Sequence, residues 1–130
     1  MSKETMKKAT FKDLIAKAIQ REKDQTKVKD IPVQSMNRTL TFVKPSESKI
    51  IDLMDELENK DSMRDQIEYM RKLIYFSCPM LQDPELHSQL GVNEPFEVVE
   101  KLFDINDTNK IGEELIELIG MANVEEDVKN

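Results

Sequence analysis

The sequence predicts a mainly α protein, a small helical domain of five to six helices with one short β-hairpin near the N-terminus. Three observations lead to this prediction. Apolar residues recur at helical spacing in most segments of the chain. One segment, from Val28 to Val43, instead contains alternating and β-branched residues. The length of 130 residues is that of one ordinary domain.

The first predicted helix covers residues 11–23. Thr10 is placed as its N-cap, and Asp13 follows three residues later, as in a capping box. The stretch 21–27 has mixed charge and no apolar residue, which is typical of a linker or a fraying helix end. The apolar positions have the spacing of one helix face and are Phe11, Leu14, Ile15, Ala18 and Ile19.

A β-hairpin is predicted over residues 27–44, with turn residues at Ser35–Asn37. Pro32 has no N–H to donate to a ladder, so its strand should lie at an edge. Two strands alone are marginally stable in water. We therefore expect the hairpin to pack on helices or to be completed by another chain.

Residues 45–120 are predicted to form a helical body. Helix-capping residues and helix-terminating residues alternate through it. The longest helix, beginning after Ser62, is the best candidate for the central one, and the last helix should cover residues 108–119. The predicted starts are Ser46–Ser48, Ser62, Asp83–Pro84 and Asn93–Pro95, and the predicted stops are Asn59, Pro79, Gly91 and Gly120.

The whole chain, residues 1–130, is interpreted as a single domain. Its parts are a mobile N-terminus (1–9), a helix with its linker (10–26), the hairpin (27–44), the helical body (45–120) and a flexible acidic tail (121–130).

Charge and hydropathy exclude several classes of protein. A net charge of -7 argues against nucleic acid as a partner. The chain has no run of eighteen apolar residues and no apolar signal segment behind its first charges. We therefore expect a cytoplasmic protein that neither spans nor binds a membrane.

The charge is divided unevenly along the chain. Residues 1–44 carry a net charge of +6, and residues 45–130 carry -13. The basic segment is either solvated, folded back on the acidic body, or docked on an acidic neighbour. We expect its helix to pack on an acidic helical face, of its own chain or of a neighbour, with Leu14, Ile15 and Ile19 buried.

The sequence indicates no catalytic, cofactor or metal site. Cys78 and His87 are the single cysteine and histidine, too few for a zinc site, and nothing marks an orienting group for a thiolate pair. Three glycines are too few for a phosphate-binding loop. Residues 104–109 resemble the start of a calcium loop, but Asn109 replaces its glycine and Leu115 its glutamate, so a helix cap is the better interpretation. We therefore expect a non-enzymatic protein without cofactors.

Leu14, Ile15 and Ile19 of the first helix are candidates for binding a partner, and two further sets of apolar residues are candidates as well. The methionines 54, 63, 70 and 80 suit either the core, which is the favoured interpretation, or an adaptable surface. Phe103 and Leu115 are predicted to line the edge of a groove between the last two helices. The alternative for these two residues is an ordinary place in the core.

Several segments together resemble the XkdN-like tail assembly chaperones of phages and phage-like particles of Gram-positive bacteria. The likeness lies in helix faces and caps over most of the chain from residue 40. The order of features agrees as well, with a short helix and a hairpin before an acidic helical body. The segments are Phe42–Ser46, Tyr75–Pro79, Asp83–Leu86, Pro95–Phe103 and Ile111–Gly120.

The resemblance implies a non-enzymatic protein that binds the tape measure protein and helps tail tube subunits assemble around it. This family has no catalytic or cofactor residues to carry over. The implied place of action is the cytoplasm of the bacterial host, with a homo-oligomer as a possible state. The alternative, suggested by the hairpin edge, is a structural or adaptor subunit of a phage tail-like particle.

Overall fold

The computed structural model describes residues 6–120. This part of the chain contains six α-helices and one antiparallel hairpin, so the predicted fold class is confirmed. The tail 121–130 and residues 1–5 of the predicted mobile N-terminus lie outside the described residues. The elements are α1 (Phe11–Gln25), β1 (Val28–Val33), β2 (Arg38–Val43), α2 (Glu47–Leu57), α3 (Met63–Ser77), α4 (Pro84–Leu90), α5 (Glu97–Leu102) and α6 (Ile105–Ile119), with the 3-10 turns η2 (Gln34–Met36) and η3 (Pro79–Gln82).

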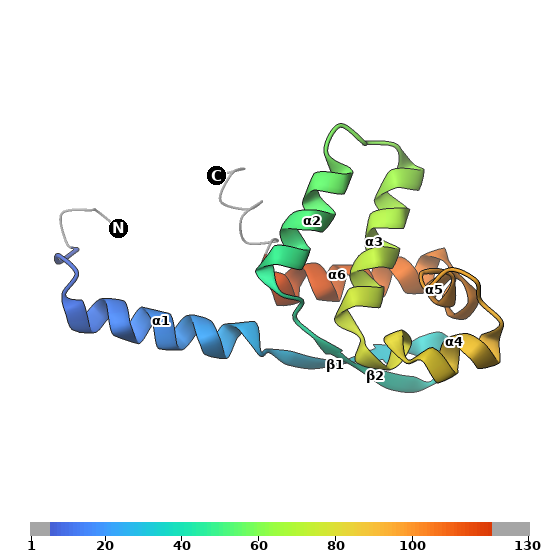
Figure 1. Cartoon of the computed structure of the whole chain (residues 1–130), viewed down its shortest axis with the longest axis horizontal. Helices are drawn as coiled ribbons and strands as arrows, with labels where there is room; N and C mark the ends of the chain where they lie inside the picture. The colour runs from blue at the N-terminus through green and yellow to red at the C-terminus, as the bar shows by residue number, and fades with distance from the viewer. Residues whose placement is uncertain (1–5, 121–130) are drawn as a thin grey trace.

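The helices and the hairpin form a body from which α1 projects (Figure 1). Helices α2 and α3 stand side by side as a helical hairpin, and α6 crosses them. The β-hairpin lies below, where β1 packs against α6 and β2 against η3. Helix α1 continues outward from β1 and lies beside no other element (Figure 1).

Local sequence signals fix most helix ends. The Thr10 side chain and Asp13 form the predicted capping box of α1. Ser62 and Asp83 cap α3 and α4 through their side-chain oxygens. Asn59 and Gly91 adopt positive φ angles of 63° and 67° after α2 and at the end of α4, as predicted for helix stops.

Three predicted helix boundaries are wrong. The helix expected to open at Asn93–Pro95 begins at Glu97 instead, with Phe96 as its N-cap. Helix α1 ends at Gln25 rather than at residue 23, so most of the apolar-free stretch is the end of the helix, which was one of its two predicted roles. Helix α6 begins at Ile105 rather than at residue 108, because Asp104 is the N-cap and its carboxylate accepts the Asp107 N–H at 2.8 Å. The Asx-rich segment is thus the first turn of α6, and the cap interpretation of Asp104 is confirmed.

The hairpin pairs Val28 with Val43 and Val33 with Arg38. Asn37 closes the turn with a φ of 54°, a left-handed conformation that asparagine tolerates. The pairing turns one face toward the helices, where Ile31, Val33 and Phe42 are buried. The hairpin packs on the helices of its own chain, which was one of the two predicted possibilities.

The core lies where α3, α6 and the hairpin meet. Ion pairs at its margin join α3 to α5 through Arg71 and Glu100, at 3.2 Å, and β1 to α6 through Lys29 and Glu114. The hydrogen bond that the Lys29 ammonium donates to the Glu114 carboxylate raises the pKa of Lys29. The largest fully buried apolar side chains are Phe42, Ile31, Leu73, Ile74, Leu81, Ile111, Leu115, Val98 and Val99.

Truncation of Leu115 should lower the free energy of unfolding by about 2–5 kcal/mol, because Leu115→Ala leaves a cavity in the core. The control is Ile51→Ala, at a side chain that is 57% exposed, and it should change stability by less than about 0.5 kcal/mol. Urea unfolding followed by circular dichroism measures both values. Equal effects of the two substitutions would contradict the placement of Leu115.

Candidate functional site

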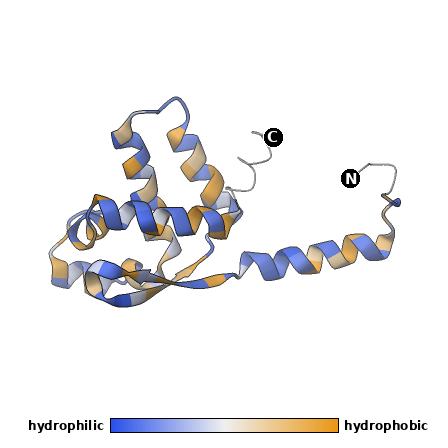
Figure 2. Ribbon diagram, turned by 180° about the vertical axis from the view of Figure 1, so that it is seen from behind, coloured by the Kyte–Doolittle hydropathy of each residue, from blue (hydrophilic) through white to orange (hydrophobic). Residues whose placement is uncertain are grey.

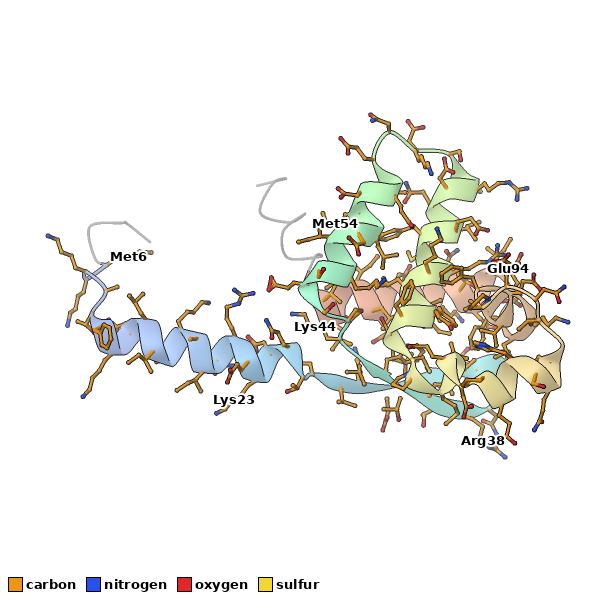
Figure 3. The ribbon with its side chains drawn as sticks, viewed as in Figure 1. Met6, Lys23, Arg38, Lys44, Met54 and Glu94 are labelled. Atoms are coloured by element: carbon orange, nitrogen blue, oxygen red, sulfur yellow. The ribbon has the colours of Figure 1, made fainter. Side chains whose placement is uncertain are left out.

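Helix α1 presents an apolar face that no described residue covers. Phe11 is 78% exposed and Leu14 62%, and Ile15 and Ile19 are about half exposed. Figure 3 shows α1 extending from the body with side chains on all its sides, and Figure 2 shows apolar patches between polar ones along it. Packing of Leu14, Ile15 and Ile19 on the chain's own acidic face is therefore a wrong prediction for this structure, while packing on a neighbour stays a prediction.

Two contacts lie near the C-terminal end of α1, one from the helix itself and one just beyond it. Arg21 forms an ion pair with Glu47 at the start of α2. The Lys44 N–H donates to the Lys27 carbonyl oxygen at 3.0 Å, extending the hairpin ladder past Val28. Only Thr26 and Lys27 separate α1 from β1, so the helix and the hairpin are closely coupled.

A groove runs between α2, α3 and α6 on the body. Two adjoining hollows form it, with volumes of about 460 and 440 Å³, and both are lined by Gln66 and Met70 of α3. We call it the α2–α3–α6 groove. Seen from behind, α6 crosses in front of α2 and α3 (Figure 2). The apolar lining residues are Met54, Leu57, Met63, Ile67, Tyr69, Met70, Ile105 and Ile116.

The rim of the groove is acidic. Asp55 and Glu58 line one hollow and Asp61 lines the other, and all three side chains are exposed. Among the described residues that line the two hollows, none is a lysine or an arginine. The groove therefore combines an apolar floor with a negative edge, which favours an amphipathic segment that carries positive charge.

Three of the four methionines are not core residues, which corrects the favoured prediction. Met54, Met63 and Met80 are 46%, 79% and 66% exposed. Met70 is half-buried against Gly112 of α6. Helical periodicity identified the methionine face but not whether another element covers it, and the concentration of thioethers was the signal for this surface.

The prediction that Phe103 and Leu115 line a groove between the last two helices is wrong. Phe103 and Leu115 are 2% and 0% exposed, so neither side chain reaches a surface where a partner can touch it. Both lie in the hydrophobic core, because α5 and α6 each pack against α3 rather than lining a groove with one another. The groove in the structure lies on another face of α6.

The residues considered for chemistry have structural roles. The His87 Nε2 atom lies 2.7 Å from the Leu81 carbonyl oxygen, where an N–H donates, and the ring stacks on Tyr75. The carboxylate of Asp107 accepts a hydrogen bond from Ser35 at 2.8 Å, which ties η2 to α6. Within residues 6–120, no group of three or more His, Cys, Asp or Glu side chains is arranged to hold a metal ion.

Comparison of the chain with protein-family models, with curated proteins and with solved structures finds no match. No helix within the described range is long and apolar enough to cross a membrane. The family resemblance of the sequence is therefore neither supported nor opposed by these comparisons, and the candidate site depends on the groove and on α1.

Cys78 should react slowly with thiol reagents in the folded protein. Its side chain is buried, and burial raises the pKa of the thiol, while the backbone N–H groups of Leu81 and Met80 offset part of the shift. We expect alkylation at least about 100-fold slower than in guanidinium-unfolded protein at the same pH. Equal rates in the two states, measured by mass spectrometry, would contradict this placement.

Proposed function

We propose that this protein is a non-enzymatic phage tail assembly chaperone that acts in the bacterial cytoplasm and holds apolar helical segments of the tape measure protein. The sequence resemblance supplies the identity of this partner. Tail tube subunits are its second implied partner, since tube assembly proceeds around the tape measure protein.

The α2–α3–α6 groove is the single observation that carries the proposal. A long helical partner with exposed apolar faces needs a surface that shields those faces from water before assembly. The groove offers an open floor of methionine, leucine and isoleucine side chains. Thioethers are flexible and polarisable, so the same floor can accept different sequences along a long helical partner.

Co-expression tests the proposal. The tape measure protein, taken from the gene beside that of this chain, should be more soluble when the two are expressed together. It should also co-purify with this chain. Met63→Glu places a charge among the apolar residues that line the groove, at a side chain already 79% exposed, so it should abolish the gain while the chain stays folded. Met80→Glu makes the same change outside the groove and should keep the gain.

Two outcomes would contradict this function. One is no increase in soluble tape measure protein with the unaltered chain. The other is an equal increase with Met63→Glu and with the unaltered chain, because the groove would then take no part in binding.

The β-hairpin favours a second candidate function, a structural subunit retained in a tail-like particle. Its sheet has two strands in the described chain, so each strand has one edge without a partner strand. Such an edge can be extended by a strand of a neighbouring subunit. Fixed stoichiometry of this chain in purified particles would favour this function over a chaperone that leaves before maturation.

A further inference from the structure

Two apolar surfaces of the same chain lack a partner in residues 6–120. One is the face of α1 that carries Phe11, Leu14, Ile15 and Ile19, here called the α1 stripe. The other is the α2–α3–α6 groove. A 15-residue helix is marginally stable in water without tertiary packing, and α1 buries none of its residues. Helix α1 therefore needs a binding partner that buries the α1 stripe in order to be stable.

The dimensions of the two surfaces agree. The groove follows α6 from Ile105 to Ile116, which at the rise of an α-helix is about 16 Å. The α1 stripe extends from Phe11 to Ile19, about 12 Å along its helix. One helix laid in the groove thus places every apolar side chain of the stripe within its length.

Their charges are complementary. On a helical wheel, Lys12 and Lys23 border one side of the α1 stripe, and Lys17 and Arg21 border the other. The groove rim carries Asp55, Glu58 and Asp61. The other segment of this chain that could be considered is 121–130, which has three acidic residues and one lysine. The negative charge of this tail opposes the rim. Residues 6–25 have six basic and three acidic side chains, a net charge of +3, so they attract the rim, although Glu22 falls on the stripe side of the wheel one turn beyond Ile19.

The position of α1 directs it to another copy. Only Thr26 and Lys27 join α1 to β1, and α1 points away from its own body, with Arg21 paired to Glu47. To enter the groove of its own chain it would have to reverse direction within Thr26 and Lys27 and lose the ion pair. A neighbouring copy can receive it as it stands.

We propose that α1 of one copy docks in the α2–α3–α6 groove of a second copy, so that the protein associates with itself through a helix-in-groove contact. Reciprocal docking closes a two-fold dimer, in which each chain gives one helix and receives one. In the free protein, α1 of a second copy occupies the groove until a tape measure helix displaces it. The displacement step, but not the self-association, rests on the proposed function.

The test uses full-length variants without any client, so its failure leaves the chaperone proposal standing. Ile15→Glu disables the stripe and leaves the groove intact, and Met54→Glu disables the groove and leaves the stripe intact. Both side chains are about half exposed, so both variants should fold. The matched controls are Ala16→Glu, at an exposed residue away from the stripe, and Met80→Glu, outside the groove.

Light scattering over a dilution series measures the dissociation constant of each sample. The unaltered chain and both controls should associate, and each disabled variant alone should associate at least tenfold more weakly. An equimolar mixture of Ile15→Glu and Met54→Glu should regain association, because one intact helix then meets one intact groove. The mixed dimer has one helix-in-groove contact where the unaltered dimer has two, so its dissociation constant should be larger.

Three results would overturn the inference. The unaltered chain could remain a monomer at all concentrations, as it would if α1 entered its own groove. Either disabled variant could associate as well as its control. The mixture could associate no better than the separate variants. Met63→Glu, at the most exposed side chain of the groove, replaces Met54→Glu if circular dichroism shows that the latter is unfolded.

Discussion

The crossing of α3 over α6 is the contact on which the rest of the structure depends. Gly112 lies at this crossing, and the Met70 side chain occupies the space that a Cβ at this position would take. Below the crossing, Leu73 and Ile74 of α3 enter the core. Above it, Met63, Ile67 and Met70 line the open groove. One helix therefore serves both the core and the candidate binding surface, and a shift of its contact with α6 would change both.

Apolar burial, rather than ion pairing, should decide where α1 goes. Burying a large aliphatic side chain contributes about 1.5–3 kcal/mol, whereas an exposed ion pair such as Arg21–Glu47 contributes about 0–1 kcal/mol. The uneven charge of the chain thus orients the helix and selects the face that it meets. The energy of docking comes from the α1 stripe, which is why a neighbour with an open apolar groove is a better destination than a polar acidic surface.

The sequence predicted local structure well because local structure depends on neighbouring residues. Thr10, Ser62 and Gly91 fix helix ends through their own side chain or backbone, and the structure has each of them in the predicted role. Hydrophobic periodicity did not predict which apolar helix faces are buried. It showed that Leu115 and Met54 lie on apolar helix faces, but which face is covered depends on how distant helices cross, and the sequence does not encode that in any short segment. Leu115 is consequently core, and Met54 is surface.

The methyl NMR spectrum of the methionines tests the central claim most directly, because the groove and the rest of the surface both contain them. The account predicts that, on dilution of the unaltered chain, the signals of Met54, Met63 and Met70 shift together while that of exposed Met80 stays constant. The same three signals should shift in the reverse direction when a peptide covering residues 6–25 is added to the dilute protein. Groove signals that respond neither to dilution nor to the peptide would contradict it.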